Sequence, residues 1–206
     1  MPMIKLRGAL GVAGLVLLAA ASAAWAQQQQ IRLRGTIASV DGAVMAIKLR
    51  DGAMLNVKVA DNATVRAVVK MSMADIKQGA FVGVTGMPQP DGSQKAIEVH
   101  IFPEAMRGTG EGHRPWDLAP NSTMTNANVE VLVTATDGPM LTLKYKDGEK
   151  KIVVTKDTAI VTYAASTKDE LKPGAVVFIN NPTKKDDGSF EASAVTVSRG
   201  GVNPPM

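Results

Sequence analysis

Residues 107–120, RGTGEGHRPWDLAP, concentrate the residue types that could do chemistry in this chain. They include one of only two histidines, His113, and one of two tryptophans, Trp116, with the charged residues Arg107 and Asp117 nearby. The alternate glycines give GTGEG a superficial likeness to a phosphate-binding loop. A dinucleotide-binding loop needs a strand before it, a helix behind it and a different glycine spacing. We therefore interpret the stretch as a ligand-binding or interdomain segment.

A second set of side chains, in and around the same stretch, suits a soft metal ion. Thioether sulfurs and imidazoles are ligands for Cu(I), and a tryptophan face can contact a cation. The candidate ligands are His100, Met106, His113 and Met124. The alternative is that Trp116 packs between two domains while the methionines fill gaps. Strand alternation in AIEVHIF puts His100 and Glu98 opposite Val99, so we expect His100 to be exposed.

Familiar catalytic patterns are missing from the sequence. There is no cysteine, no GxSxG elbow and no HExxH zinc motif. Many aspartates stand before glycines, where side-chain bonding within a hairpin turn explains them, and DDGS lacks the spaced oxygen ligands of a calcium loop. We therefore expect a protein that is not an enzyme and has no cofactor other than the copper considered above.

The first 26 residues have the pattern of a signal peptide. Lys5 and Arg7 precede an uncharged run of 17 residues, GALGVAGLVLLAAASAA, and Ala24–Ala26 has the small-x-small form of a cleavage site. The run is shorter than the roughly 20 residues of a membrane span. We expect a periplasmic or secreted mature chain that begins at Gln27 and has no membrane span, with an uncleaved anchor as the alternative.

The charge of the mature chain does not favour a nucleic-acid partner. Loss of the two basic leader residues lowers the formal net charge from +4 to about +2, because 4 − 2 = 2. So small an excess predicts neither nucleic-acid nor anionic-membrane binding. Aromatic residues, which could stack on bases, make up only 4% of the sequence. The expected partner is an unknown protein or a small ligand.

An internal duplication is the clearest organisational signal. The segment GTIASVDGAVMAIKLRDGAMLNVKVADNATV corresponds to VLVTATDGPMLTLKYKDGEKKIVVTKDTAIV. Asp41 corresponds to Asp137, since 41 + 96 = 137, and Asp91 corresponds to Asp187 at the same offset. MADIKQGAFVGV likewise corresponds to KDELKPGAVVFI. The mature chain therefore contains two copies of one unit.

Each copy has the pattern of a small β-domain. Alternating apolar residues predict three strands joined by Asp-Gly hairpins. Ser72–Asp75 and Thr167–Glu170 resemble capping boxes, which predict one short helix in each copy. Two further strands follow. Three strands, a helix and two strands is the order of a five-stranded OB-type barrel; a sandwich or another small barrel is the alternative within the all-β class.

The repeated motifs resemble those of a widespread family of exported bacterial domains of unknown function. The resemblance is carried by GTIASVDG, DIKQGAFVGVTG and PDGSQKAIEV, and by TATDG, ELKPGAVVFI and DDGSFEASAV. It covers both copies and implies an exported barrel, with no catalytic residues to transfer. Some members are labelled metal transporter permeases, but we find no later segment of membrane-spanning length to support that label.

MADIKQGAFVGV is also similar, more faintly, to a segment of periplasmic copper-binding barrels of the OB type. Those proteins pair a Met-x-Met strand with a tryptophan. Here Met71 and Met73 stand at the predicted helix start instead, without a neighbouring tryptophan.

The sequence thus predicts two tandem five-stranded OB-like barrels, one formed by each copy. The expected divisions are a signal peptide (1–26), the first barrel (27–103), an ordered inter-repeat segment (104–127), the second barrel (128–199) and a flexible tail (200–206). The expected function is binding or envelope association without catalysis. Arg107, His113, Trp116 and Asp117 are the candidate ligand or interdomain residues, and periplasmic Cu(I) binding is the alternative function.

Overall fold

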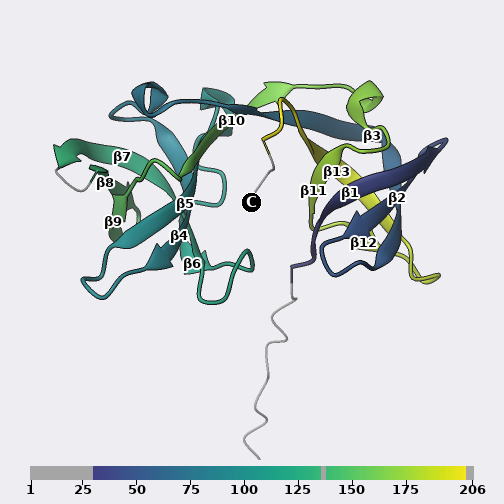
Figure 1. Ribbon diagram of the computed structural model, residues 1–206, viewed down its shortest axis with the longest axis horizontal. Helices are drawn as coiled ribbons and strands as arrows, with labels where there is room; N and C mark the ends of the chain where they lie inside the picture. The colour runs from purple at the N-terminus through teal and green to yellow at the C-terminus, as the bar shows by residue number, and fades with distance from the viewer. Residues whose placement is uncertain (1–29, 136–137, 203–206) are drawn as a thin grey trace, which may run out of the picture.

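The chain folds as an all-β structure with its strands gathered into two lobes (Figure 1). The structure is a computed structural model that describes residues 30–135 and 138–202. The predicted signal peptide, residues 1–26, lies outside these ranges, as does the end of the predicted tail. Across the two described ranges, no helix is both long enough and apolar enough to cross a membrane.

The elements are given for the predicted first copy, the inter-repeat segment and the predicted second copy in turn. The first copy provides β1 (Arg32–Asp41), β2 (Val44–Leu49), β3 (Met54–Lys70), the 3₁₀ turn η1 (Met73–Asp75), β4 (Phe81–Pro88) and β5 (Gln94–Ile101). The inter-repeat segment contains the 3₁₀ turn η2 (Glu104–Met106) and β6 (Gly112–Pro115). The second copy provides β7 (Thr123–Ala135), β8 (Gly138–Tyr145), β9 (Gly148–Val153), β10 (Ala159–Ala165), the 3₁₀ turn η3 (Lys168–Glu170), β11 (Val176–Asn180), β12 (Thr183–Lys184) and β13 (Phe190–Ser198).

Asp-Gly turns join several of these strands. Gly42, between β1 and β2, has φ +55°, a backbone conformation that glycine adopts without steric cost. In the β4–β5 turn, the amide and hydroxyl of Ser93 donate to Asp91 Oδ1 at 2.9 and 2.7 Å. Ser189 donates to Asp187 Oδ1 in the same way at 2.9 and 2.6 Å. Hydrogen bonding within the turn therefore explains the presence of Asp91 and of Asp187, the second aspartate of DDGS.

The predicted short helices are not confirmed. At both places the described chain forms a single three-residue 3₁₀ turn, followed within a few residues by a glycine of positive φ, Gly79 or Gly174. Ser72 caps the first turn, because its amide and hydroxyl donate to Asp75 Oδ2 at 2.8 and 2.6 Å. The first turn ends at Ile76, whose backbone is extended with φ −75° and ψ 114°, so it does not continue as a longer helix.

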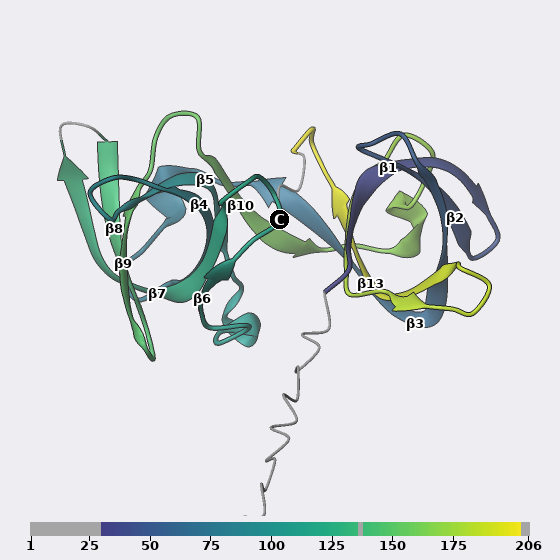
Figure 2. The ribbon, with the colours of Figure 1, turned by 90° about the horizontal axis from the view of Figure 1, so that it is seen from below.

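Backbone pairing closes two rings of five strands, which are visible end-on in Figure 2. In the first lobe β1 pairs with β2, β2 with β3, β3 with β13, β13 with β11, and β11 with β1. In the second lobe β7 pairs with β8, β8 with β9, β9 with β5, β5 with β4, and β4 with β7. All pairs are antiparallel except β3 with β13 and β9 with β5.

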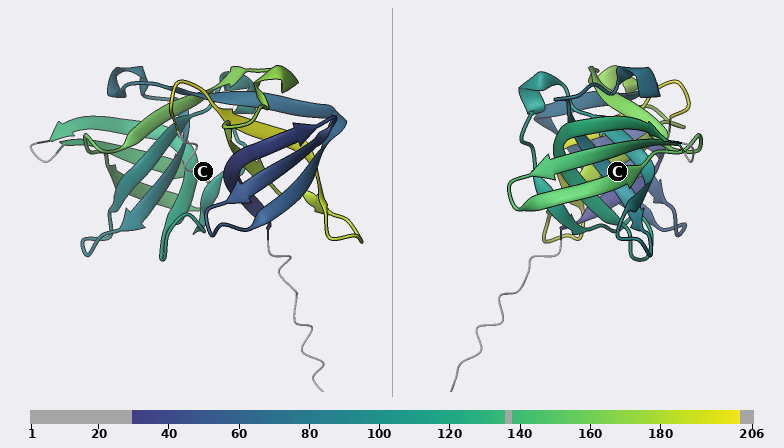
Figure 3. Two further views of the ribbon diagram at one scale, coloured as in Figure 1. Left: turned by 45° about the vertical axis from the view of Figure 1, so that its right-hand side comes forward. Right: turned by 90° about the vertical axis from the view of Figure 1, so that its left-hand side faces the viewer.

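Each ring takes three strands from one copy and two from the other. The expectation that each copy closes on itself is therefore not confirmed. The cause is β3, which runs for 17 residues without a turn and carries the chain out of the first lobe (Figures 1 and 3). Strands β4 and β5 then complete the ring of β7–β9, while β11 and β13 return to complete the ring of β1–β3.

The two copies meet at an antiparallel pairing between β3 and β10. Ala67 lies opposite Ala164, and Val68 lies opposite Tyr163. The 96-residue offset between the copies makes these two pairs equivalent. Position 67 corresponds to position 163, since 67 + 96 = 163, and position 164 corresponds to position 68, since 164 − 96 = 68. A pseudo-two-fold axis therefore passes through this pairing and relates the two lobes.

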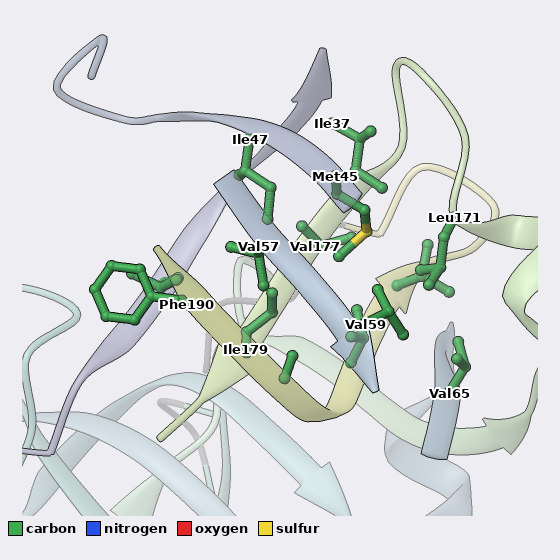
Figure 4. Close-up of a cluster of buried hydrophobic side chains, with 14 of the residues drawn as sticks. Ile37, Met45, Ile47, Val57, Val59, Val65, Leu171, Val177, Ile179 and Phe190 are labelled. Carbon is green, nitrogen blue, oxygen red and sulfur yellow. The ribbon is translucent and has the colours of Figure 1, made fainter. Parts of the chain in front are cut away.

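Each lobe has its own apolar core, and both cores combine the two copies. In the first lobe Ile37, Met45 and Ile47 of the first copy pack with Val177 and Ile179 of the second (Figure 4). In the second lobe Val84 and Val99 of the first copy pack with Leu141, Leu143 and Ile152 of the second. Burial of apolar area in either lobe therefore requires both halves of the chain.

This exchange predicts that the halves fold only together. Residues 27–117 and 118–206, produced separately, are each expected to lack a cooperative thermal unfolding transition, because each has only part of two cores. Mixing them is expected to give a one-to-one complex that unfolds cooperatively, measured by circular dichroism and native mass spectrometry. A stable folded monomer of either half would contradict the exchanged pairing.

Candidate functional site

A cavity of about 560 Å³ lies between the two lobes, larger than the other main hollows of the described surface. Three parts of the chain line it. The first lobe and β3 contribute Gln30, Arg66, Phe178, Asn180, Ala194 and Thr196. The second lobe and the residues next to it contribute Gly83, Phe102, Met124, Asn126 and Tyr163. The inter-repeat segment contributes Met106, Thr109, Gly110, Glu111, Arg114 and Trp116.

The cavity wall gathers aromatic residues, which are scarce in the chain. The sequence has eight, since two Trp, two Tyr and four Phe make 2 + 2 + 4 = 8, and Phe102, Trp116, Tyr163 and Phe178 line this cavity. Gly83 makes room for one of them, because a Cβ at this position would lie 2.9 Å from Phe102 Cε2. Such rings offer flat apolar surfaces to a ligand.

The inter-repeat segment is attached to both lobes. Its strand β6 pairs antiparallel with β7 of the second lobe. The Arg32 guanidinium of the first lobe lies 3.8 Å from the centroid of the Trp116 ring. Arg34 donates to both carboxylate oxygens of Asp117 at 2.8 and 3.2 Å. Trp116 and Asp117 thus contact the first lobe, and the segment closes one side of the cavity.

Arg107, the third candidate of this stretch, does not line the cavity. It donates to both carboxylate oxygens of Glu104 at 2.5 and 2.7 Å and to Asn128 Oδ1 at 2.6 Å. It also donates to the carbonyl of Gly79 at 3.1 Å. These bonds hold the 3₁₀ turn η2 against the second lobe, so Arg107 positions the segment that covers the cavity.

His100 is buried, which corrects the expectation of an exposed side chain. Its exposed fraction is 1%, and its ring contacts those of Tyr163 and Phe102, whose centroids are 4.0 and 4.8 Å away. Alternation does put His100 on the face of β5 opposite Val99. That face is covered by aromatic rings, because β10 pairs beside β5 and carries Tyr163, whose ring packs against His100 together with that of Phe102. The sequence pattern gave the face of the strand but not the neighbour that covers it.

Glu98 lies beside His100 in the same buried position. Its Oε1 is 3.6 Å from His100 Nδ1, and both side chains are 1% exposed. Within the described chain, neither carboxylate oxygen and neither ring nitrogen has a partner at hydrogen-bonding distance. Burial raises the pKa of the Glu98 carboxyl, although nearby His100 and Arg34 act in the opposite direction. A buried acid with so little compensation is costly for folding.

Tyr163 connects this buried pair to the cavity. Its ring lines the cavity wall and packs at a tilt of 52° against His100, while Arg66 lies over it at 5.6 Å from the ring centroid. Burial, together with the nearby Glu98, raises the pKa of Tyr163 to about 12. The phenol is therefore neutral at physiological pH and offers the cavity an uncharged aromatic surface.

The structure does not bring the four candidate copper ligands together. Met106 and Met124 both line the cavity, but His100 is covered by aromatic rings. His113 pairs with Thr125, and its Nδ1 lies 2.8 Å from Thr125 Oγ1. Since Met124 faces the cavity, alternation places Thr125 and His113 on the other side of the sheet. Nor does the described chain contain a group of three or more His, Asp or Glu side chains placed to hold a metal ion.

Sequence reasoning missed Glu98, Arg66 and Tyr163 as site residues. A signal was present in the difference between the two copies. The offset of 96 puts Ala194 at the place of Glu98 and Thr196 at the place of His100, since 98 + 96 = 194 and 100 + 96 = 196. The fold itself therefore does not need an acid and an imidazole at these positions.

The buried carboxyl predicts a pH-dependent gain of stability in Glu98→Gln. The pKa of Glu98 is higher in the folded than in the unfolded chain, where it is about 4.3. Wild-type stability therefore falls as the pH rises above about 4.3, because the unfolded chain loses this proton first. The groups facing it are His100, Tyr163 and Arg34. We expect the variant to be more stable than wild type by about 1 to 4 kcal/mol in mildly alkaline buffer, and the gain to shrink in acid.

Denaturant unfolding at two pH values measures this difference. Glu130→Gln is the matched control, since Glu130 is an exposed residue 3.9 Å from Lys144, and its stability is expected to stay close to that of wild type. A loss of stability in Glu98→Gln that is the same at both pH values would show that the carboxylate is a stabilising ion-pair partner instead.

Comparison with known proteins does not identify the site. No family model, curated protein or solved structure matches the chain. The case for a function therefore depends on the cavity, its lining residues and the exchanged strands that place them.

Proposed function

We propose that the protein is an exported, non-catalytic binding protein that holds a small ligand in the cavity between its lobes. The observation that carries this proposal is the cavity itself, about 560 Å³ in volume and lined by both lobes and by the inter-repeat segment. Its volume falls within the roughly 300–1,000 Å³ typical of small-molecule sites. A single-stranded nucleic acid would instead require a long basic groove with a row of stacking aromatics.

The two rings support an assignment of each lobe to the OB-type barrels. In both, the strand order is that of a five-stranded barrel in which the third and fifth strands are parallel. The lobes would then be two barrels that have exchanged their last two strands. Such an arrangement fixes the lobes relative to each other, because neither can move away without breaking the pairing of β3 with β10. A cavity between fixed walls is preformed, which lowers the entropic cost of binding.

The chemistry of the wall favours binding over catalysis. The groups best suited to proton transfer, Glu98 and His100, do not line the cavity and lie behind the rings of Tyr163 and Phe102. The one acidic lining residue, Glu111, is exposed and accepts a hydrogen bond from the Lys146 amide at 3.1 Å. A general base must come within hydrogen-bonding reach of the proton that it takes, and neither histidine satisfies this condition.

Export is supported by the N-terminal pattern and by the resemblance to exported domains. It predicts that the intact mass of the protein, purified from the cells that produce it naturally, corresponds to a chain beginning at Gln27. Cleavage near Ala26 follows from the small residues flanking the apolar run. A mass that includes residues 1–26 would contradict the signal-peptide assignment and favour a retained anchor.

Blocking the cavity tests the binding proposal. Native mass spectrometry of the protein from its own cells is expected to show a non-covalent ligand bound to the wild-type chain. Ala194 lines the cavity, so Ala194→Phe would fill part of it and is expected to remove the ligand. The control is Ser193→Phe, which places the same ring at the neighbouring exposed position of β13 and is expected to retain the ligand.

Trp116 gives a second measurement for these variants. It is the only tryptophan of a chain that begins at Gln27, and it lines the cavity, so its fluorescence should change when ligand is removed. A ligand that stays bound to Ala194→Phe would place the binding site elsewhere. Wild-type protein that carries no ligand, with fluorescence unchanged after unfolding and refolding, would contradict the proposal.

A further inference from the structure

Two arginines on the cavity wall have no carboxylate partner among residues 30–135 and 138–202. Arg66, on β3, is half-buried and contacts the Tyr163 ring; among the residues that the structure describes it forms no ion pair. Arg114, on β6, donates to the carbonyl of Gly110 at 2.7 Å and likewise lacks an acidic partner within the described chain. Burial and the nearby Arg32 lower the pKa of the Arg114 guanidinium, as expected for a cation that lacks compensation.

The acids around the cavity do not balance this charge. Asp117 is already used by Arg34, in a two-fold hydrogen bond, and by Arg32 at 3.6 Å. Glu111 is the single acidic residue among those that line the cavity, and its Oε1 accepts a hydrogen bond from the Lys146 amide at 3.1 Å. Two lining arginines against one lining acid leave the cavity wall net positive. Guanidinium groups are well suited to oxyanions, which they bind through paired N–H donors.

The rest of the wall is suited to an apolar and flat body. Four aromatic rings and two methionine side chains face the same space as the two arginines. Arg114 lies 5.6 Å from the centroid of the Trp116 ring, and Arg66 lies at the same distance from that of Tyr163. Each unpaired cation therefore stands next to an aromatic surface. A ligand that uses both has an anionic group and an apolar group in one small molecule.

Building on the function proposed above, we propose that the ligand is an amphipathic organic oxyanion, with a carboxylate- or sulfonate-like group that contacts Arg66 and Arg114 and a flat apolar body that lies against the aromatic rings. The same two arginines disfavour a free metal cation in this space, because like charges repel in a partly desolvated site. The arrangement thus selects against the copper alternative as well as for an anion.

A pair of fluorescent probes that differ in one group tests the ligand class. Anilinonaphthalene sulfonate carries an anionic group on an aromatic body, and N-phenylnaphthylamine has the same body without the sulfonate. We expect the chain that begins at Gln27 to bind the anionic probe more tightly than the neutral one. Arg66→Gln and Arg114→Gln should each weaken binding of the anionic probe about tenfold, a typical loss for one charge-assisted hydrogen bond.

The neutral probe controls for folding in the same experiment. Its affinity should change by less than about twofold in both variants, as expected when no charge-assisted bond is lost. The charge-matched control is Arg50→Gln, since Arg50 is exposed and lies outside this cavity; it should leave both affinities unchanged. In wild-type protein, added salt should weaken binding of the anionic probe and leave binding of the neutral probe unchanged. This measurement needs no variant.

The outcomes separate the ligand class from the binding function. If both probes bind equally, and neither depends on the two arginines or on salt, the oxyanion inference is wrong while a binding cavity remains. If the two arginine variants also lose the neutral probe, the arginines support the cavity instead of recognising an anion, and the inference is again wrong. If Ala194→Phe leaves binding of both probes intact, the probes do not occupy this cavity and both proposals fail.

Discussion

The unbroken course of β3 is the constraint on which the rest of the structure depends. Over its 17 residues it pairs with β2 and β13 in the first lobe and then with β10 at the junction. Because it does not turn back, β4 and β5 can only complete the opposite ring, and β11 and β13 must return to fill the place left open. The two apolar cores, the space between the lobes and the position of the inter-repeat segment all follow from this one long strand.

The site residues take their places from the same crossing. Arg66 and Tyr163 come from β3 and β10, the two strands that pair at the junction, so both lie where the lobes meet. The strand β5 pairs with β10 there, and the rings of Tyr163 and Phe102 pack against His100, which lies beside Glu98. Burial of that pair without hydrogen-bond partners lowers the stability of the folded state, and apolar side chains of similar volume would give a more stable contact there. Proteins tend to carry such local costs near functional sites, and this one lies directly behind the wall of the cavity.

Much of the local structure could be predicted from the sequence. The Asp-Gly turns, the alternation of β1–β3 and the duplication are short-range or periodic signals, and the structure contains the corresponding strands. The exchange could not be predicted, because the two copies have nearly the same strand patterns and local preference does not say which copy a strand will pair with. Trp116 could be identified from its rarity, and it does lie between the lobes. Arg66 and Tyr163 could not, because an arginine and a tyrosine in strands have no distinctive pattern until the partner strand is known.

The pseudo-two-fold axis through the β3–β10 pairing has a consequence for the shape of a ligand. A dimer of two identical units would present the same side chains on both sides of its axis, and would offer any molecule bound on that axis two equivalent orientations. Covalent fusion of the units removes that requirement. Here Glu98 and His100 stand where the opposite strand has Ala194 and Thr196, and the segment carrying Trp116 covers one side alone. A scaffold with approximate symmetry thus encloses an unsymmetrical space, in which an unsymmetrical molecule has a single preferred direction.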